Sequence, residues 1–251
     1  MMHKMAMAID NPMRVCDSAD FDGTNDYMNR GADLTGSADS KLGIVSVWLR
    51  LDGGDAANQM FLNNGTLATN HFSVRRINTN IFVVTGANAA GTPILSITTT
   101  STYTAGATWL HLLSSWNLGT AGARSIYMND VSDLTQLTFT DDTLDYTLTD
   151  WSVGALTDGA SKLDGCMAEL YFAPGQYLDF SLVHNRRKFI SASGKPVHLG
   201  TTGALPTGTA PLVYLHLDDA EAVANFATNR GTGGDFSITG TLATGSDSPS
   251  D

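Results

Sequence analysis

The 251-residue sequence contains no run of about 18 apolar residues, and its Met-rich opening MMHKMAMAIDNPM lacks the continuous apolar segment of a secretory signal. We therefore expect a chain that neither spans a membrane nor is exported. Glutamate occurs only as Glu169 and Glu221, and lysine is similarly scarce, although both residue types favour exposed helix surfaces. This composition argues against a helical protein.

Cysteine is equally scarce. Cys16 and Cys166 are too few and too far apart for a disulfide scaffold or a zinc knuckle, so we expect two free thiols in a protein assembled in a reducing cytoplasm. The formal net charge of −11 repels a polyanion, and we expect no nucleic-acid partner. The sequence also lacks a Gly-x-Ser-x-Gly motif, closely spaced histidines and a phosphate-binding glycine loop, which leaves no signal for a triad, a zinc site or a nucleotide site.

What the sequence does contain is alternation of apolar and polar residues in short segments that are separated by Gly, Asn and Asp. In the segment 44–51, every second residue from Val45 to Leu51 is apolar. The expected strands are 44–51, 59–63, 71–77, 81–84, 94–99, 109–116, 125–129, 151–154, 166–172, 212–217 and 236–242. This pattern predicts an all-β sandwich or jelly roll.

Only one helix is expected. It begins near Ser181 as its N-cap, ends before Gly194 and packs on the edge of the strand array. The expected organisation is an N-terminal arm at 1–19, a single domain at 20–244 whose C-terminal extension covers 176–244, and a solvated tail at 245–251.

Four segments carry more specific motifs. They are 20–27 (DFDGTNDY), 44–50 (IVSVWLR), 109–112 (WLHL) followed by 124–130 (RSIYMND), and 163–171 (LDGCMAELY). In this order they resemble the laminin-G-like and pentraxin-like jelly rolls of the concanavalin A-like superfamily. The resemblance implies a concanavalin A-like jelly-roll β-sandwich with one short helix and an extended C-terminal segment. It also implies that the opening and returning strands are neighbours, which would bring Cys16 and Cys166 close enough for a disulfide. The prediction of free thiols therefore rests on the reducing compartment.

Residues 177–211 include NRRKFISASGKPVHLG and LPTGTAP, which are similar to a C-terminal extension of such domains on tailed bacteriophages and in prophages. This second resemblance implies a virion setting, with assembly in the host cytoplasm and capsid or tail proteins as partners. A free jelly roll exposes sheet edges, so we also expect association with identical copies.

Glu169 is the residue on which a glycosidase interpretation depends. Glycosidases that resemble this fold place Glu-x-Asp-x-x-Glu on one strand, so that the carboxylates share a face. Here LYFAP follows Glu169, and no companion carboxylate is present. We therefore expect a protein that is not an enzyme. Two alternatives remain open, which are a host carbohydrate-binding lectin module and a glycoside hydrolase.

Calcium is the candidate cofactor, because relatives of this fold bind it with loop carboxylates. Two turns are crowded with aspartate: one with Asp20, Asp22 and Asp26, the other with Asp141, Asp142 and Asp145. Neither spacing is that of an EF-hand, and aspartate is also an ordinary turn former. The first group is the expected metal site.

Carbohydrate binding needs directional polar groups and an aromatic platform. The aromatic candidates are Trp48, Trp109, Tyr127 and Tyr171, and residues of this kind are more often core residues in an all-β chain. The better candidates lie in loops rich in Asn, Asp and Gly: Asp55, Asn58, Asn63, Asn64, Asn78 and Asn80. The favoured function is a non-enzymatic surface protein of a tailed-phage virion, as head decoration, fibre or tail-associated protein, that binds a bacterial surface glycan.

Overall fold

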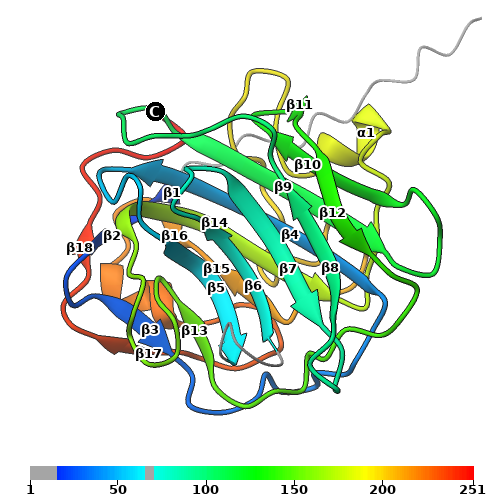
Figure 1. Ribbon diagram of the computed structural model, residues 1–251. Coiled ribbons are helices and arrows are strands. Elements are labelled where there is room, and N and C mark those ends of the chain that lie inside the picture. Colours follow the sequence, from blue (N-terminus) through cyan, green and yellow to red (C-terminus); the bar gives the residue numbers. More distant parts are fainter. Residues whose placement is uncertain (1–15, 66–70) are drawn as a thin grey trace, which may run out of the picture.

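The computed structural model describes residues 16–65 and 71–251 as a sandwich of two antiparallel sheets (Figure 1). The predicted all-β architecture with one short helix is confirmed. Among the described helices, none has the length and apolar character needed to cross a membrane. Of the predicted N-terminal arm, residues 1–15 lie outside the described part of the chain.

Sheet I has the strand order β11 (Val131–Ser132), β10 (Arg124–Met128), β9 (Leu110–Asn117), β4 (Leu42–Leu51), β14 (Asp164–Pro174), β2 (Ala19–Asp22) and β18 (Ala243–Thr244), and β15 (Val213–Leu215) also pairs with β14. The long strand β14 is central. It pairs with β4 on one side, and on its other side it pairs first with β2 and then with β15.

Sheet II has the order β12 (Thr135–Phe139), β8 (Pro93–Thr98), β7 (Phe82–Ala87), β6 (His71–Arg76), β5 (Gln59–Gly65), β13 (Trp151–Val153), β3 (Tyr27–Asn29) and β17 (Ser237–Thr239). A separate pair is formed by β1 (Cys16–Asp17) and β16 (Leu217–Asp218), and the helical segments are α1 (Val183–Arg186) and the 3₁₀ helix η1 (Val223–Ala227). Because β17 lies in sheet II while β15 and β18 lie in sheet I, residues 213–244 contribute strands to both sheets.

The main core lies between the sheets and is built from alternating side chains. Val45 and Val47 of β4 face Phe72 and Val74 of β6, and all four are buried in one cluster. Aromatic rings fill its centre, where Phe72 stacks on Phe172 at a centroid distance of 4.9 Å. Trp116 lies in the same cluster, and its Nε1 donates a hydrogen bond of 3.0 Å to Tyr146 Oη, so the one polar atom of the indole is satisfied in the core.

The extension 176–211 covers the outer face of sheet I. Tyr171 and Tyr214 point outward from β14 and β15, and Phe180 and Phe189 pack over them in a second buried cluster. The helix between Phe180 and Phe189 lies at the β10 edge of sheet I, where Arg186 pairs with Asp130, in agreement with the expectation that it packs on the edge of the strand array. The helix is shorter than expected, however. It covers only Val183–Arg186, Ser181 does not cap it, and the chain soon turns back so that Ile190 pairs with Pro196.

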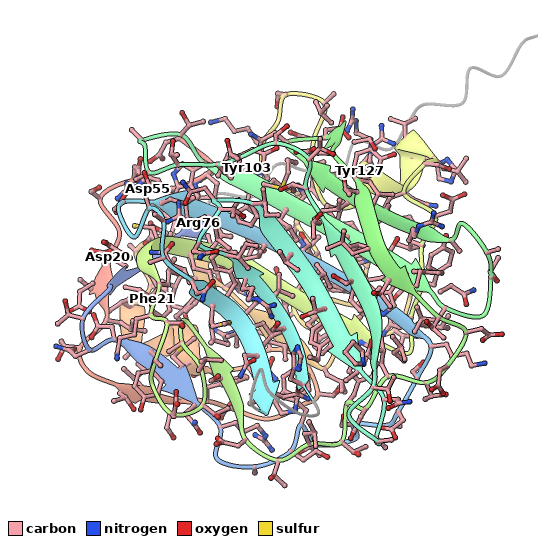
Figure 2. All side chains as sticks on the ribbon, in the orientation of Figure 1. Asp20, Phe21, Asp55, Arg76, Tyr103 and Tyr127 are labelled. Atoms are coloured by element: carbon pink, nitrogen blue, oxygen red, sulfur yellow. The ribbon has the colours of Figure 1, made fainter. Side chains whose placement is uncertain are left out.

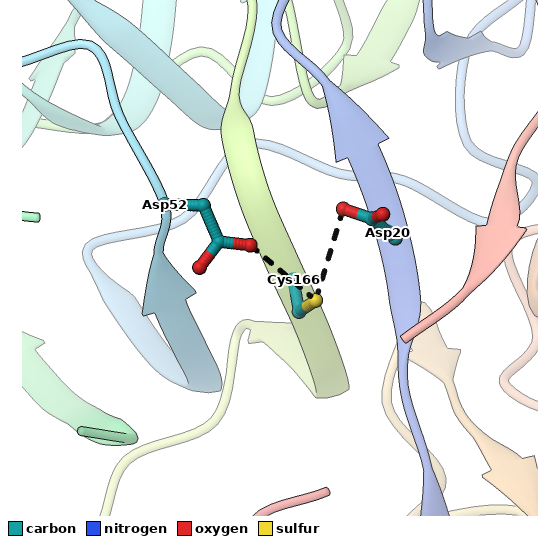
Figure 3. Close-up of side chains that lie close together, drawn as sticks. All are labelled: Asp20, Asp52 and Cys166. Atoms are coloured by element: carbon teal, nitrogen blue, oxygen red, sulfur yellow. Dashed lines mark hydrogen bonds between the residues drawn. The ribbon is translucent and has the colours of Figure 1, made fainter. Parts of the chain in front are cut away.

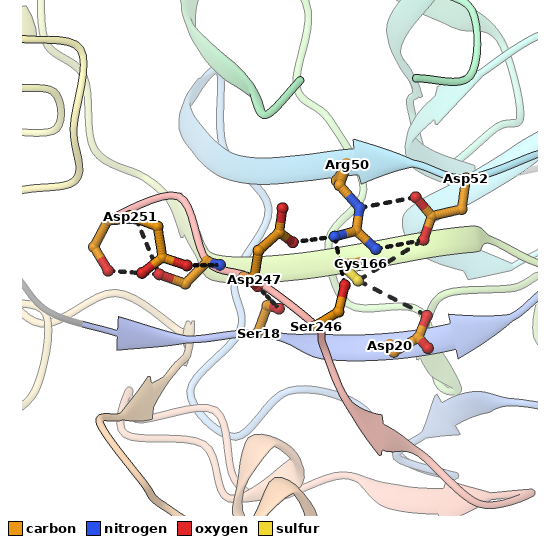
Figure 4. Close-up of polar contacts among 10 residues, drawn as sticks. Ser18, Asp20, Arg50, Asp52, Cys166, Ser246, Asp247 and Asp251 are labelled. Atoms are coloured by element: carbon orange, nitrogen blue, oxygen red, sulfur yellow. Dashed lines mark hydrogen bonds and ion pairs between the residues drawn. The ribbon is translucent and has the colours of Figure 1, made fainter. Parts of the chain in front are cut away.

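The C-terminal residues 245–251 do not form a solvated tail. The Gly245 N–H donates to Ser18 O at 2.9 Å, and Ser18 Oγ donates to Asp247 O at 2.8 Å. The Asp247 carboxylate forms an ion pair with Arg50 of β4, and Ser248 is buried (Figure 4). The segment is thus held against β2 and β4, which corrects the expectation from its Ser- and Asp-rich composition.

Candidate functional site

A hollow of about 620 Å³ lies at the β10 edge of sheet I, close to α1. Its lining consists of Asn117, Thr120, Ala121, Gly122, Ala123, Arg124, Ser125, Tyr127, Ser132, Leu134, Tyr177, Asp179 and Ser181. Two tyrosines and a majority of polar residues therefore share one concave surface. Ligand sites combine these properties, with a concave shape, apolar rings and a few polar groups that fix orientation.

The strand pairing explains why this edge is hollowed. β10 pairs with β9 over its whole length, but β11 pairs with only Tyr127 and Met128. Arg124 and Ser125 therefore have no strand neighbour on the outer side of β10. The turn before them contains Gly122 at a φ of 82°, a conformation that favours glycine. The hollow occupies the space left between this turn, β11 and the start of the extension.

Tyr127 is fixed in place by charged neighbours. The Arg186 guanidinium lies over its ring at 4.6 Å from the centroid. Arg186 Nε and Arg187 Nη2 pair with the two carboxylate oxygens of Asp130 at 2.5 and 2.7 Å. Burial acts to raise the pKa of Asp130, but the two arginines lower it, and the net shift is downward. Tyr127 is labelled in Figure 2.

The extension contributes the opposite wall of the hollow. Tyr177 is half-buried, and its pKa is raised by burial and by the nearby Asp179 carboxylate. Asp179 Oδ1 accepts a hydrogen bond of 2.9 Å from the Ser181 N–H. The arrangement can pack a flat apolar surface against a tyrosine ring while carboxylate, amide and hydroxyl groups bond to its polar edge.

Of the four aromatic candidates from the sequence, only Tyr127 lines this hollow. Trp48 and Tyr171 are buried, and Trp109 packs against Trp48. Tyr177 and Asp179 were missed by the sequence analysis. They lie in the extension, whose return over sheet I depends on long-range packing and leaves no local periodic signal.

Four of the predicted sugar-binding residues lie together in a second place, at the loops that follow β4 and β6. Asn58 Oδ1 accepts from the Asn78 N–H at 3.2 Å, and Asn80 Oδ1 accepts from the Ala56 N–H at 3.0 Å. Asp55 pairs with Arg76, and Figure 2 shows both beside Tyr103. The side-chain oxygens of Asp55, Asn58 and Asn80 thus hold the loops to one another.

Asn63 and Asn64 lie elsewhere and are not sugar contacts. Both are in β5 with no exposed surface. Asn63 Nδ2 donates to Gly65 O at 3.1 Å, and Asn64 Oδ1 accepts from the Phe72 N–H. The segment reads as a polar loop in the sequence, but it is the end of a paired strand.

Asp20, Asp22 and Asp26 do not converge on one point. Asp22 Oδ1 caps its own turn by accepting the Thr24 and Asn25 N–H groups at 2.8 and 2.9 Å, which lowers the pKa of Asp22. Asp26 is buried and its Oδ1 accepts the Thr241 N–H at 2.6 Å. These carboxylates serve the backbone. In the second predicted group, Asp141 pairs with Lys41, and Asp142 accepts from Asn88.

Asp20 belongs instead to a group with Asp52 and Cys166, whose ligand atoms lie within 4.8 Å of one another. Figure 3 shows the Cys166 thiol between the carboxylates, with Sγ 3.8 Å from Asp20 Oδ1. Burial raises the pKa of the thiol to about 12, and burial and Asp52 raise that of Asp20. Arg50 binds both oxygens of Asp52 at 2.8 Å, so a cation here would compete with Arg50 (Figure 4). Cys166 is a free, buried thiol.

His216, Asp218 and Glu221 form one other group in the described chain whose possible ligand atoms lie within 4.8 Å of one another. It adjoins a cavity of about 90 Å³. Glu221 Oε1 pairs with Arg230 at 2.6 Å, and its Oε2 accepts the Asp218 N–H at 2.9 Å. Here too a cation would compete with an arginine.

Glu169 and Ser46 are held in structural contacts. Glu169 is 2% exposed, lies at a bulge of β14 with a φ of 51°, and accepts a hydrogen bond of 2.8 Å from Tyr214 Oη. Ser46 Oγ lies 2.8 Å from His111 Nε2, but both side chains are buried beside Trp48, which stacks on the imidazole at 4.5 Å. Burial lowers the pKa of His111 to about 3, so the ring is a poor base.

No family model matches the sequence, and no curated protein matches it. Solved structures do match. A protein from Bacteroides ovatus, provisionally described as carbohydrate-binding, has a TM-score of 0.60 at 13% identity, with 93% of this chain and 60% of that chain covered. This chain thus spans less than two thirds of that protein. The heptameric SAP-like pentraxin of Limulus polyphemus has a TM-score of 0.53 at 10% identity, with 92% and 94% covered. These likenesses confirm the predicted fold, a concanavalin A-like jelly-roll sandwich.

Proposed function

We propose that this protein is a non-enzymatic glycan-binding protein and that the hollow between β10 and the extension is its binding site. The observation that carries the proposal is the meeting of Tyr127 and Tyr177 with amide, hydroxyl and carboxylate groups in one hollow of about 620 Å³. Ligand sites typically enclose roughly 300–1,000 Å³. The hollow has room for a short saccharide.

The chemistry of the lining suits a sugar ring. A pyranose has a face of C–H groups that packs on an aromatic ring and an edge of hydroxyls that bond to polar groups. Tyr177 offers a ring on the wall formed by the extension. Asn117, Ser132 and Asp179 offer donors and acceptors around it.

The lining supports binding without cleavage. Glycosidic cleavage needs two carboxyl groups that flank the scissile bond. Asp179 is the one carboxylate among the residues that line the hollow, and Glu169 is buried in a contact with Tyr214. The neighbour from Bacteroides ovatus is provisionally described as a carbohydrate-binding protein, which agrees with this proposal at the level of the fold.

The test measures affinity for a panel of bacterial exopolysaccharides by isothermal titration calorimetry. We expect Tyr177→Ala to weaken binding about tenfold or more, as loss of a central aromatic contact does. Asn78→Ala, in the competing loop cluster, should bind as the unchanged protein does. Loss of binding in Asn78→Ala with full binding in Tyr177→Ala would overturn the assignment of the site. Release of reducing ends from a bound polysaccharide would overturn the non-enzymatic part.

We further propose a virion surface as the setting, with capsid or tail proteins and identical copies as partners. The support is the similarity of residues 177–211 to the extensions of tailed-phage and prophage proteins. Peptides of this chain in purified phage particles, found by mass spectrometry, are the expected result. Their absence from particles would overturn the virion assignment and favour a host lectin module.

A further inference from the structure

One arginine of the described chain has a side chain without any hydrogen bond or ion pair, and it is Arg124. The other described arginines all donate to a carboxylate, carbonyl or hydroxyl: Arg30, Arg50, Arg75, Arg76, Arg186, Arg187 and Arg230. The Arg124 Nε is buried and has no partner. In a sequence with 25 acidic and 14 basic residues, an arginine without an acceptor is unexpected.

The surroundings of Arg124 indicate where a partner for its guanidinium would lie. The guanidinium lies over the Phe139 ring at 5.1 Å from the centroid. Stacking of this kind uses the face of the guanidinium and leaves its N–H edges for other partners. Arg124 lines the proposed glycan hollow and also an adjoining hollow of about 750 Å³ that contains Phe139 and Asp141. It therefore stands where the two hollows meet.

We infer that Arg124 makes the hollow selective for acidic saccharides, by pairing its guanidinium with the carboxylate of a bound sugar. This inference rests on the proposed glycan-binding function. The arginine fork matches a carboxylate with two parallel hydrogen bonds, and such charge-assisted bonds are stronger than neutral ones.

The acidic groups that line the two hollows, Asp179 and Asp141, are already engaged. Asp179 Oδ1 accepts the Ser181 N–H at 2.9 Å, and Asp141 pairs with Lys41 at 2.7 Å. Both would repel an anion placed beside them. The sugar carboxylate is therefore confined to the position at Arg124. We expect the hollow to select both the negative charge of the sugar and the place of that charge on the sugar ring.

The test uses short oligosaccharides that carry a single uronic acid, because the net charge of −11 repels a polyanion, and the same oligosaccharides after chemical reduction of the carboxyl group to an alcohol. We expect the unchanged protein to bind the acidic form about tenfold or more tightly than the reduced form, with an affinity that falls as salt rises. Arg124→Gln should abolish this preference. Arg124→Lys should keep part of it, because the charge remains without the fork. Lys195→Gln removes one positive charge elsewhere and should change nothing.

The outcomes separate the two proposals. Equal binding of the acidic and the reduced oligosaccharides, lost in Tyr177→Ala, would overturn the acidic selectivity and leave glycan binding standing. A preference for the acidic oligosaccharides that survives in Arg124→Gln would also overturn the role of Arg124. No binding to either form would overturn the proposed function together with this inference. The melting temperature of Arg124→Gln shows whether the variant is folded.

Discussion

Arg76 buries its entire side chain and forms an ion pair of 2.8 Å with Asp55, which is half-exposed at the end of the sandwich. The guanidinium also donates to Gly53 O at 2.8 Å and to Tyr103 O at 3.0 Å. Asp55 Oδ1 in turn accepts the Ala105 N–H at 2.9 Å. One buried arginine thus ties together the loops after β4 and β8, and the Asp55 carboxylate, which the sequence predicts to contact sugar, takes part in holding these loops.

Asp55→Ala should destabilise the fold. The buried guanidinium loses its carboxylate, and an unsatisfied buried donor retains its desolvation penalty, so we expect the free energy of unfolding to fall by about 2 kcal/mol. Urea unfolding monitored by tryptophan fluorescence measures the loss. Thr79→Ala, at an exposed position in the loop after β6, is the control, with an expected loss under about 0.5 kcal/mol. Equal losses in the two variants would contradict the structural role of Asp55.

The C-terminal segment should contribute measurable stability. Asp247→Ala removes the ion pair with Arg50 but leaves Arg50 bound to Asp52, so we expect a loss of only about 1 kcal/mol. Deletion of residues 245–251 should cost more, because it also removes the contacts to Ser18. Differential scanning calorimetry measures both. The exposed Asp219→Ala is the control, and a deletion variant with the melting temperature of the unchanged protein would show that the segment is a free tail.

Cys166 should be unreactive in the folded protein. Burial raises the pKa of its thiol to about 12, and the nearby Asp20 and Asp52 carboxylates act in the same direction, so almost none of the thiolate nucleophile is present at pH 8. In a Cys16→Ser background, we expect iodoacetamide to modify Cys166 about a hundredfold more slowly in the folded than in the urea-unfolded protein. Similar rates in the two states, measured by intact mass, would contradict this environment.

Asp133 should make stability depend on pH. Burial acts to raise the pKa of its carboxyl, but hydrogen bonds from Tyr103 Oη at 2.6 Å and the Thr100 N–H at 2.8 Å lower it, and the net shift is downward. A carboxyl with a lowered folded pKa stabilises the fold above its unfolded pKa of about 3.9. That contribution is lost as the pH falls through the folded pKa.

Tyr103→Phe removes one of these donors. We expect a loss of about 1 kcal/mol at pH 7 and a difference from the unchanged protein that shrinks as the pH falls below about 3.9, because the protonated carboxyl no longer benefits from the donor. Unfolding free energies from pH 7 to pH 3 measure this trend. A difference that stays constant over the whole range would show that the Tyr103 hydroxyl does not act through the ionised Asp133 carboxylate, since phenylalanine keeps the ring contact with Phe82.

The central strands could be predicted because their signal is local. In 44–51 and 166–172, the alternation of apolar and polar residues directly reflects the two faces of a strand. The strands β3 and β12 were missed, since a three-residue strand such as β3 is defined by its pairing with β13 and β17. The helix after Ser181 was overpredicted because its sequence is compatible with a longer helix, but Phe180 and Phe189 are drawn onto the outer face of sheet I.

The candidate site was predictable only in part. Tyr127 was named as an aromatic candidate within the expected strand 125–129, but its partner Tyr177 lies 50 residues further along the chain and arrives through the fold of the extension. Arg124 gave no signal, because its lack of an acceptor is a property of the folded surroundings. In the Asn- and Asp-rich loops, composition alone does not separate a structural role from a binding role, because these side chains bond equally well to backbone and to ligand.

Glycan binding in the hollow is tested most directly by a titration of the ¹⁵N-labelled protein with an exopolysaccharide oligomer, followed by backbone amide chemical shifts. We expect the largest shifts at residues 120–127 and 177–181, the two walls of the hollow. Largest shifts at 53–58 and 77–80 would place the glycan on the loop cluster and contradict the assignment of the site. Shifts at neither place, with saturating ligand, would contradict glycan binding itself.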